Sequence, residues 1–215
     1  MALPTTGPDL PRRLTRALLA GPPGDTARHE LMPVAVDGTA FDRPAPRNDT
    51  RDAAVLLLLY PDTGHRDWYL TLIKRPDYDG VHSGQIAFPG GRREGEESLT
   101  ETALRETREE VGVDPGEVTL LGELTPFFVF ASNHMVHPFV GYVSVRPGFV
   151  PCEIEVAQIL EIPLSHLLEP ANLRHETREL RWGPARIPFF AVDDHKVWGA
   201  TAMVLAEFLE LTRRL

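Results

Sequence analysis

Apolar residues along the chain follow two spacings, one typical of strands and the other of helices. Residues 53–60 are a continuous apolar run of strand length, as expected for a strand buried on both faces. Short apolar or alternating segments predict further strands at 68–75, 84–88, 118–128, 137–145 and 187–192, and a strand turning into a short helix at 154–168. Helical spacing predicts helices at 98–111 and 198–213. Strands before and after a central helix, closed by a second helix, predict an α/β sandwich with a mixed sheet.

The first 50 residues differ in composition from the rest of the chain. They are rich in proline and glycine, and their one amphipathic segment runs from about Arg12 to Ala20. Leu14, Leu18 and Leu19 lie on one side of that segment. We therefore expect an N-terminal arm with one short helix over residues 1–50 and a compact domain over residues 51–215.

The charge of the chain limits its partners. The 22 Lys and Arg residues against 31 Asp and Glu give a formal net charge of −9. Sequence-blind binding to nucleic acid or to an anionic membrane needs a basic surface, so neither partner is expected. No apolar run approaches the roughly 20 residues of a membrane-spanning helix, and we expect a cytoplasmic protein. An anionic substrate would need metal ions or well-placed arginines.

The predicted helix at 98–111 carries the strongest chemical signal. Ser98 and Glu101 have the spacing of a capping box, and Gly112 is placed as the C-terminal stop. At about 100° per residue, Glu106, Glu109 and Glu110 share one sector of the helix. Like charges so close repel one another, and Mg²⁺ or Mn²⁺, which prefer carboxylate oxygens, would offset that cost. A solvated acidic face is the alternative, and helix geometry alone does not decide between the two.

The surrounding sequence resembles the Nudix box, G-x5-E-x7-R-E-U-x-E-E-x-G-U, in which U is apolar. The positions that fit are Gly91, Glu97, Arg105, Glu106, Glu109, Glu110, Gly112 and Val113, while Thr107 departs from the first U. The resemblance implies the Nudix α/β/α sandwich and cleavage of a nucleoside diphosphate linked to another group. It also implies Mg²⁺ or Mn²⁺ held by Glu106, Glu109 and Glu110, with the carbonyl of Gly90 or Gly91. Glu97 and Arg105 resemble the supporting pair that holds the loop to the helix.

The segment before the box is similar to the motif of Nudix coenzyme A pyrophosphatases. The matching positions are Leu72, Arg75, Gly84, Phe88, Pro89, Gly90 and Gly91, and the departures are Thr71, Ile73, Pro76 and Gly80. Gly80 stands where the motif has an arginine, which leaves Lys74, Arg92 and Arg93 as other candidate cations beside Arg75. The resemblance implies hydrolysis of coenzyme A or acyl-coenzyme A to 3′,5′-ADP and 4′-phosphopantetheine or its acyl form. The residues it marks for substrate contact are Arg75, His82, Gly84, Gln85, Phe88, Gly90 and Gly91.

Several alternatives stay open at this point. Gly84, Gln85 and Phe88 also fit a purely structural strand and turn that lead into the helix. Glu155, which follows a proline-rich loop, is a candidate further metal ligand or general base, or else a charge at a loop edge. Other nucleoside diphosphate derivatives, such as ADP-ribose or NADH, compete with coenzyme A as substrate, and a non-catalytic nucleotide sensor is the remaining class. A homodimer is compatible with this family.

Overall fold

A single long strand, β2 (Arg51–Pro61), forms the centre of the molecule. The computed structural model describes residues 7–41, 44–77, 83–180 and 183–215. Successive side chains of β2 enter two separate apolar cores, Leu57 and Leu59 on one face and Leu56 and Leu58 on the other. The uninterrupted apolar run predicted as a strand therefore has partners on both faces, and that prediction is confirmed.

Eight strands form the sheet around β2. They are β2, β3 (Trp68–Lys74), β4 (Ile86–Ala87), β5 (Gly90–Arg92), β6 (Thr119–Glu123), β7 (Phe127–Val129), β8 (His134–Tyr142) and β9 (Gln158–Pro163). β2 pairs in parallel with β8, whereas the other pairings in this sheet are antiparallel. The sheet is therefore mixed, as predicted.

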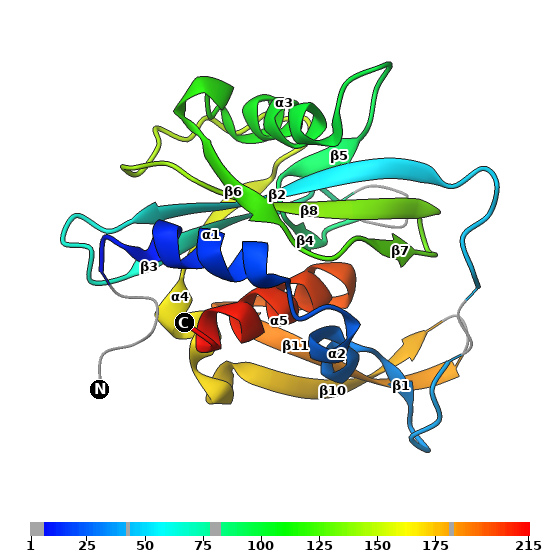
Figure 1. Ribbon diagram of the computed structural model, residues 1–215. Coiled ribbons are helices and arrows are strands. Elements are labelled where there is room, and N and C mark those ends of the chain that lie inside the picture. The colour runs from blue at the N-terminus through cyan, green and yellow to red at the C-terminus, as the bar shows by residue number, and fades with distance from the viewer. Residues whose placement is uncertain (1–6, 42–43, 78–82, 181–182) are drawn as a thin grey trace.

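Helices cover both faces of this sheet (Figure 1). α3 (Leu99–Val111) packs on the face that carries Leu56 and Leu58, through Ala103 and Val111. α1 (Leu10–Ala20) and α5 (Gly199–Arg213) pack on the opposite face, in the core that contains Leu57. This arrangement confirms the predicted α/β class with layers of helix, sheet and helix.

A second sheet lies beyond α5, so that α5 is enclosed between two sheets (Figure 1). It is antiparallel and consists of β1 (Val34–Ala35), β10 (Leu173–Leu180), β11 (Gly183–Val192) and β12 (His195–Trp198). The sequence predicted one of these strands, at 187–192. β10 was missed because its sequence, LRHETREL, contains hardly any of the apolar or β-branched residues that mark strands.

The N-terminal segment contributes to the main core. α1 begins two residues earlier than predicted, at Leu10, and its Leu10, Leu14 and Leu18 side chains are buried with those of the sheet. Leu19, which was expected on the same side as Leu14 and Leu18, is instead 83% exposed. The short helix α2 (Asp25–Arg28) is joined to α5 by an ion pair between the fully buried side chains of Arg28 and Glu207. The remaining short helical segments are His29–Leu31, Pro115–Glu117, α4 (Leu164–Leu168) and Pro170–Asn172. Across the described residues, helices that combine the length and apolarity needed to cross a bilayer are lacking.

Candidate active site

The carboxylate helix α3 is fixed at both ends as its sequence predicts. The N–H of Glu101 donates to the hydroxyl of Ser98 (3.3 Å), and the N–H of Ser98 donates to the Glu101 carboxylate (2.7 Å). At the other end Gly112 adopts the left-handed conformation (φ 77°) that ends a helix at little cost for glycine. Thr107, the one departure from the box, is fully buried, and its hydroxyl donates to the carbonyl of Ala103. The departure therefore leaves the helix intact.

The three carboxylates of the helix face different environments. Glu110 is 2% exposed, and one of its oxygens accepts a hydrogen bond from the N–H of Gly90 (2.8 Å). Glu106 is 14% exposed and lies against Gly91. Glu109 is 54% exposed and pairs with Arg105 (2.9 Å). The helix thus directs Glu106 and Glu110 inward, while Glu109 stays at the surface.

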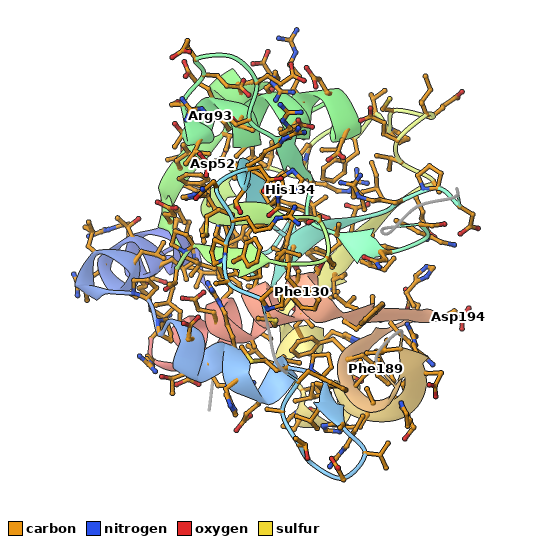
Figure 2. The ribbon with its side chains drawn as sticks, turned by 90° about the vertical axis from the view of Figure 1, so that its right-hand side faces the viewer. Asp52, Arg93, Phe130, His134, Phe189 and Asp194 are labelled. Carbon is orange, nitrogen blue, oxygen red and sulfur yellow. The ribbon has the colours of Figure 1, made fainter. Side chains whose placement is uncertain are left out.

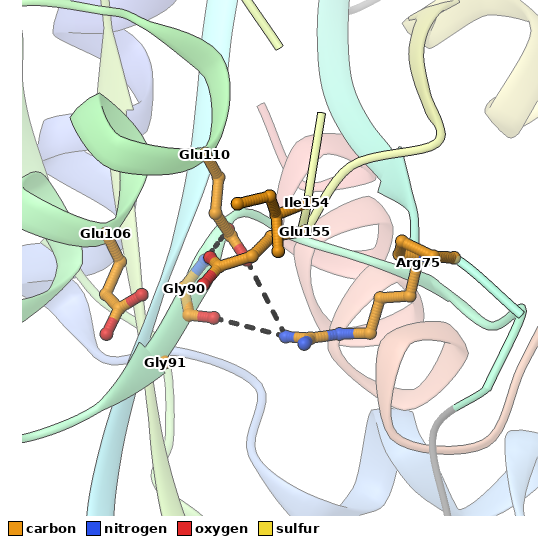
Figure 3. Close-up of a pocket in the computed structure, with 8 residues that line it drawn as sticks. Arg75, Gly90, Gly91, Glu106, Glu110, Ile154 and Glu155 are labelled. Carbon is orange, nitrogen blue, oxygen red and sulfur yellow. Dashed lines mark hydrogen bonds and ion pairs between the residues drawn. The ribbon is translucent and has the colours of Figure 1, made fainter. Parts of the chain in front are cut away.

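A cavity of about 280 Å³ opens beside Glu106 and Glu110 (Figure 3). Its lining consists of Arg75, Pro76, Gly90, Gly91, Glu106, Glu110, Ile154 and Glu155. Glu155 reaches this cavity from a loop tied to the end of α3, because the N–H of Cys152 donates to the carbonyl of Glu110 (2.9 Å) and the N–H of Glu155 donates to that of Cys152 (3.0 Å). Six of the residues predicted as catalytic, metal-binding or substrate-binding therefore line one cavity, namely Arg75, Gly90, Gly91, Glu106, Glu110 and Glu155.

Burial, together with neighbouring carboxylates, disfavours the charged forms of Glu106 and Glu110. Burial raises the pKa of Glu110 to about 7, and the nearby carboxylates of Glu106 and Glu155 add to that rise. Burial likewise raises the pKa of Glu106, against the opposing effect of Arg105. Carboxylates together with the carbonyl of Gly90 are the oxygen donors that Mg²⁺ and Mn²⁺ prefer. The donor chemistry fits a hard divalent cation, although within the described residues three or more His, Cys, Asp or Glu side chains do not already converge on one point.

Glu97 and Arg105 hold the loop before α3 against the helix. Nε and Nη2 of Arg105 donate to the two oxygens of the Glu97 carboxylate (3.0 and 2.9 Å). These bonds lower the pKa of Glu97 to about 2. Nη1 of the same guanidinium lies 3.0 Å from Glu106 and 2.9 Å from Glu109, and Nη2 donates to the carbonyl of Arg92 (3.1 Å). Arg105 therefore joins the loop, the end of β5 and two carboxylates of the helix.

The residues marked for substrate contact fall in three places. Arg75, Gly90 and Gly91 line the cavity described above. Phe88 is 3% exposed and belongs to the apolar core, in keeping with its structural alternative. Gly84 and Gln85 lie in the wall of a second cavity. His82 and Gly80 lie outside the described residues.

The second cavity, of about 380 Å³, lies between the end of β3 and the second sheet. It is lined by Lys74, Asp77, Ser83, Gly84, Gln85, Ile86, Arg178, Asp194, His195, Lys196 and Trp198. Arg178 (2.6 Å) and Lys196 both pair with Glu176, so two cations share one carboxylate. Asp194 lies in the turn between β11 and β12, at the outer edge of the molecule (Figure 2). Arg178 and Lys196 were not among the predicted site residues, because β10 and β12 were not predicted as strands.

Arg93, which the sequence left as another candidate cation, lines neither of the two cavities. Its Nε donates to the carbonyl of Glu97 (2.7 Å), and its Nη1 lies 3.9 Å from the carboxylate of Asp52 (Figure 2). Arg93 therefore supports the loop before α3, and Arg75 is the cation nearest the inward carboxylate Glu110 in the part of the chain that the structure describes.

Comparisons with known proteins agree with this geometry. The NUDIX domain pattern matches residues 50–185. A protein named "Uncharacterized Nudix hydrolase NudL" from Pectobacterium atrosepticum is 35% identical over 161 residues, which cover 74% of this chain and 82% of the relative. "Nudix hydrolase 15, mitochondrial" from Arabidopsis thaliana is 33% identical over 170 residues, or 74% of this chain and 58% of the relative.

Solved structures share the fold at low sequence identity. The Nudix hydrolase RenU from M. smegmatis superposes with a TM-score of 0.54 at 17% identity, over 85% of this chain and 94% of that one. A MutT/nudix family protein from Enterococcus faecalis gives a TM-score of 0.50 at 14% identity, over 94% and 74% of the two chains. The capped carboxylate helix faces a cavity lined by Gly90 and Gly91 of β5. With the domain match over residues 50–185 and relatives above 30% identity, this chain belongs to the Nudix family.

Proposed function

We propose that the protein hydrolyses the diphosphate bond of coenzyme A or acyl-coenzyme A, releasing 3′,5′-ADP and 4′-phosphopantetheine or its acyl form. The observation that carries the diphosphate half of this proposal is the convergence of Glu106, Glu110 and Glu155 with Arg75 on one cavity. An acidic cavity would repel a diphosphate unless positive charge is supplied, and both a bound cation and Arg75 would supply it.

Each residue has a distinct part in the proposed reaction. Glu106, Glu110 and the carbonyl of Gly90 would hold Mg²⁺ or Mn²⁺, with Glu109, the third ligand that the resemblance implies, at the exposed side of the helix beside Arg105. When bound, the metal would neutralise phosphate charge and lower the pKa of an attacking water. Glu155 lines the same cavity on a loop and is our candidate general base. The planar guanidinium of Arg75 is suited to phosphate oxygens. Glu97 and Arg105 do not line the cavity and act by positioning the helix and Glu106.

The assignment of coenzyme A as the substrate rests on the residues that match the subfamily motif. The second cavity supports this assignment. Lys74 lines that cavity and Arg75 lines the first, so the end of β3 is a wall of both. We propose that a substrate bound by its diphosphate beside Arg75 places its ribose phosphate near Lys74, Arg178 and Lys196. The carboxylates of Asp77 and Asp194 also line the second cavity, so the expected gain in affinity is modest.

Two other functions remain as competitors. The replacement of the motif arginine by Gly80 favours a different nucleoside diphosphate derivative, such as ADP-ribose or NADH. A nucleotide sensor without catalytic activity would not need its carboxylates, whereas here Glu106 and Glu110 both face the cavity. The second competitor is therefore the weaker.

A substrate panel tests the proposal. The protein is incubated with Mg²⁺ or Mn²⁺ and, in parallel, with coenzyme A, ADP-ribose, NADH and a dNTP, and the products are separated by chromatography. We expect 3′,5′-ADP from coenzyme A, and loss of that product in Glu110→Gln, which keeps the size of the side chain. Cleavage of ADP-ribose with coenzyme A left intact would refute the substrate assignment, and an unchanged rate in Glu110→Gln would refute the carboxylate assignment.

A further inference from the structure

The guanidinium of Arg75 lies between two oxygen atoms that belong to the candidate cation site. Its Nη2 is 3.4 Å from the carbonyl oxygen of Gly90, to which it donates, and 3.8 Å from a carboxylate oxygen of Glu110 (Figure 3). The backbone N–H of Arg75 donates to the carbonyl of Gln85 (3.0 Å), which fixes the start of the side chain at the end of β3. Nη2 of Arg75 therefore contacts one oxygen from β5 and one oxygen from α3.

Both oxygens are held in place by other contacts. Gly90 pairs with Val55 in the antiparallel ladder between β5 and β2. The other oxygen of the Glu110 carboxylate is held by the N–H of Gly90 (2.8 Å), and the whole side chain is 2% exposed. Arg75, by contrast, has a long side chain that is 29% exposed and borders the open cavity. Of the three groups, the Arg75 side chain is therefore the one with space beside it to change its conformation.

A buried carboxylate is costly without a nearby positive charge, and the guanidinium of Arg75 supplies one. The same two oxygens are hard donors of the kind that Mg²⁺ and Mn²⁺ prefer. Two cations at one pair of oxygens would repel each other strongly in such a buried place. Arg75 and a divalent cation are thus alternative partners of Gly90 and Glu110.

We propose that Arg75 is an exchangeable counter-cation, which pairs with Gly90 and Glu110 in the metal-free protein and turns to the substrate diphosphate once a divalent cation is bound. The second half of this statement rests on the proposed function, because it needs a phosphate in the cavity. Two consequences follow. First, Arg75 weakens metal binding in the absence of substrate. Second, Arg75 can bind the diphosphate only in the metal-loaded protein, so metal is expected to bind before substrate.

Metal affinity without substrate separates this role from a structural one. Mn²⁺ binding to the full chain is measured by isothermal titration calorimetry for the wild type and for Arg75→Gln, with Lys74→Gln as the matched control. The control removes one positive charge from the adjacent residue, which lines the other cavity. We expect Arg75→Gln to bind Mn²⁺ on the order of tenfold more tightly, with a much smaller change in Lys74→Gln. Unchanged or weaker Mn²⁺ binding in Arg75→Gln would overturn the proposal.

A measurement on the wild-type chain avoids any effect of the substitution on folding. The ¹⁵N–¹H signal of the Arg75 Nε–H, assigned by its loss in Arg75→Lys, should shift when Mg²⁺ is added without substrate. A signal that stays in place at saturating Mg²⁺ would show that Arg75 keeps its partners, and would refute the exchange. Failure of the proposed function gives a different result, namely intact coenzyme A in the substrate panel, whatever the Mn²⁺ affinities are.

Discussion

The carboxylate of Glu106 lies so close to Gly91 that a methyl group on that glycine would overlap it. Only glycine at residue 91 therefore leaves space for the Glu106 carboxylate where the structure places it. We expect Gly91→Ala to displace Glu106 and to lower the rate of diphosphate cleavage on the order of 10²-fold, with the far-ultraviolet circular dichroism unchanged. Gly148→Ala is the control, because a methyl group there meets no atom within 4 Å. Equal activity in the two variants would contradict this account of Gly91.

The raised pKa of Glu110 gives the metal-free protein a defined dependence of stability on pH. The pKa rises from an ordinary value of 4.5 to about 7 in the folded state, so above 4.5 the folded protein keeps a proton that the unfolded chain releases. The contribution of Glu110 to stability is complete below 4.5 and is lost as the pH rises through 7. The change corresponds to roughly 3 kcal/mol.

Glu110→Gln removes this ionisable group and should flatten the dependence. Thermal melts in EDTA between pH 4.5 and 7.5 should show a steeper fall of Tm for the wild type than for Glu110→Gln. The depressed pKa of Glu97, about 2, affects stability only below its ordinary range, outside this window. Parallel pH profiles for the two proteins would show that Glu110 ionises normally.

The bidentate pair of Glu97 and Arg105 should be coupled in stability. Both side chains are partly buried, and two hydrogen bonds join them. A double-mutant cycle with Glu97→Gln and Arg105→Gln, measured by urea unfolding, should give a coupling free energy of about 1 to 3 kcal/mol. The exposed pair Glu210 and Arg214 is the control, for which about 0.3 to 0.5 kcal/mol is expected. Additive effects at Glu97 and Arg105 would mean that the loop is held by other contacts.

The role of the second cavity is tested by a pair of substrates that differ by one phosphate. Lys196→Gln should raise KM several-fold for coenzyme A and leave KM for dephospho-coenzyme A unchanged, because only coenzyme A carries the ribose 3′-phosphate. Arg174→Gln, a change of the same charge on β10 outside the cavity lining, should alter neither value. An equal change of KM for both substrates would place the phosphate elsewhere.

The sequence predicted the central sheet and the carboxylate helix because their local signals agree with their environments. The apolar run at 53–60 matches a strand buried on both faces, and Ser98 and Gly112 define the helix by short-range chemistry. Helical spacing also placed Glu106, Glu109 and Glu110 in one sector. It could not show that Glu110 would be 2% exposed and Glu109 54% exposed, since these values depend on β5 and the loop that carries Glu155.

The second sheet and its cations escaped prediction for a different reason. β10 is stabilised by pairing along its length with β11 and has few apolar side chains of its own. Arg178 and Lys196 come together through their shared partner Glu176, across strands that local patterns did not reveal. Such contacts join residues that lie on separate strands, so no local spacing of residues in the sequence predicts them.

The parallel pairing of β2 with β8 has a consequence for how the protein folds. The chain between these strands contains β5 and the whole of α3, so the carboxylate helix lies within the loop that this pairing closes. Closing so long a loop costs entropy before the pairing is gained, which makes the step slow and cooperative. The pairing of β2 with β8 therefore cannot form during synthesis until β8 has left the ribosome, and the carboxylates of α3 are expected to become ordered in the same late step.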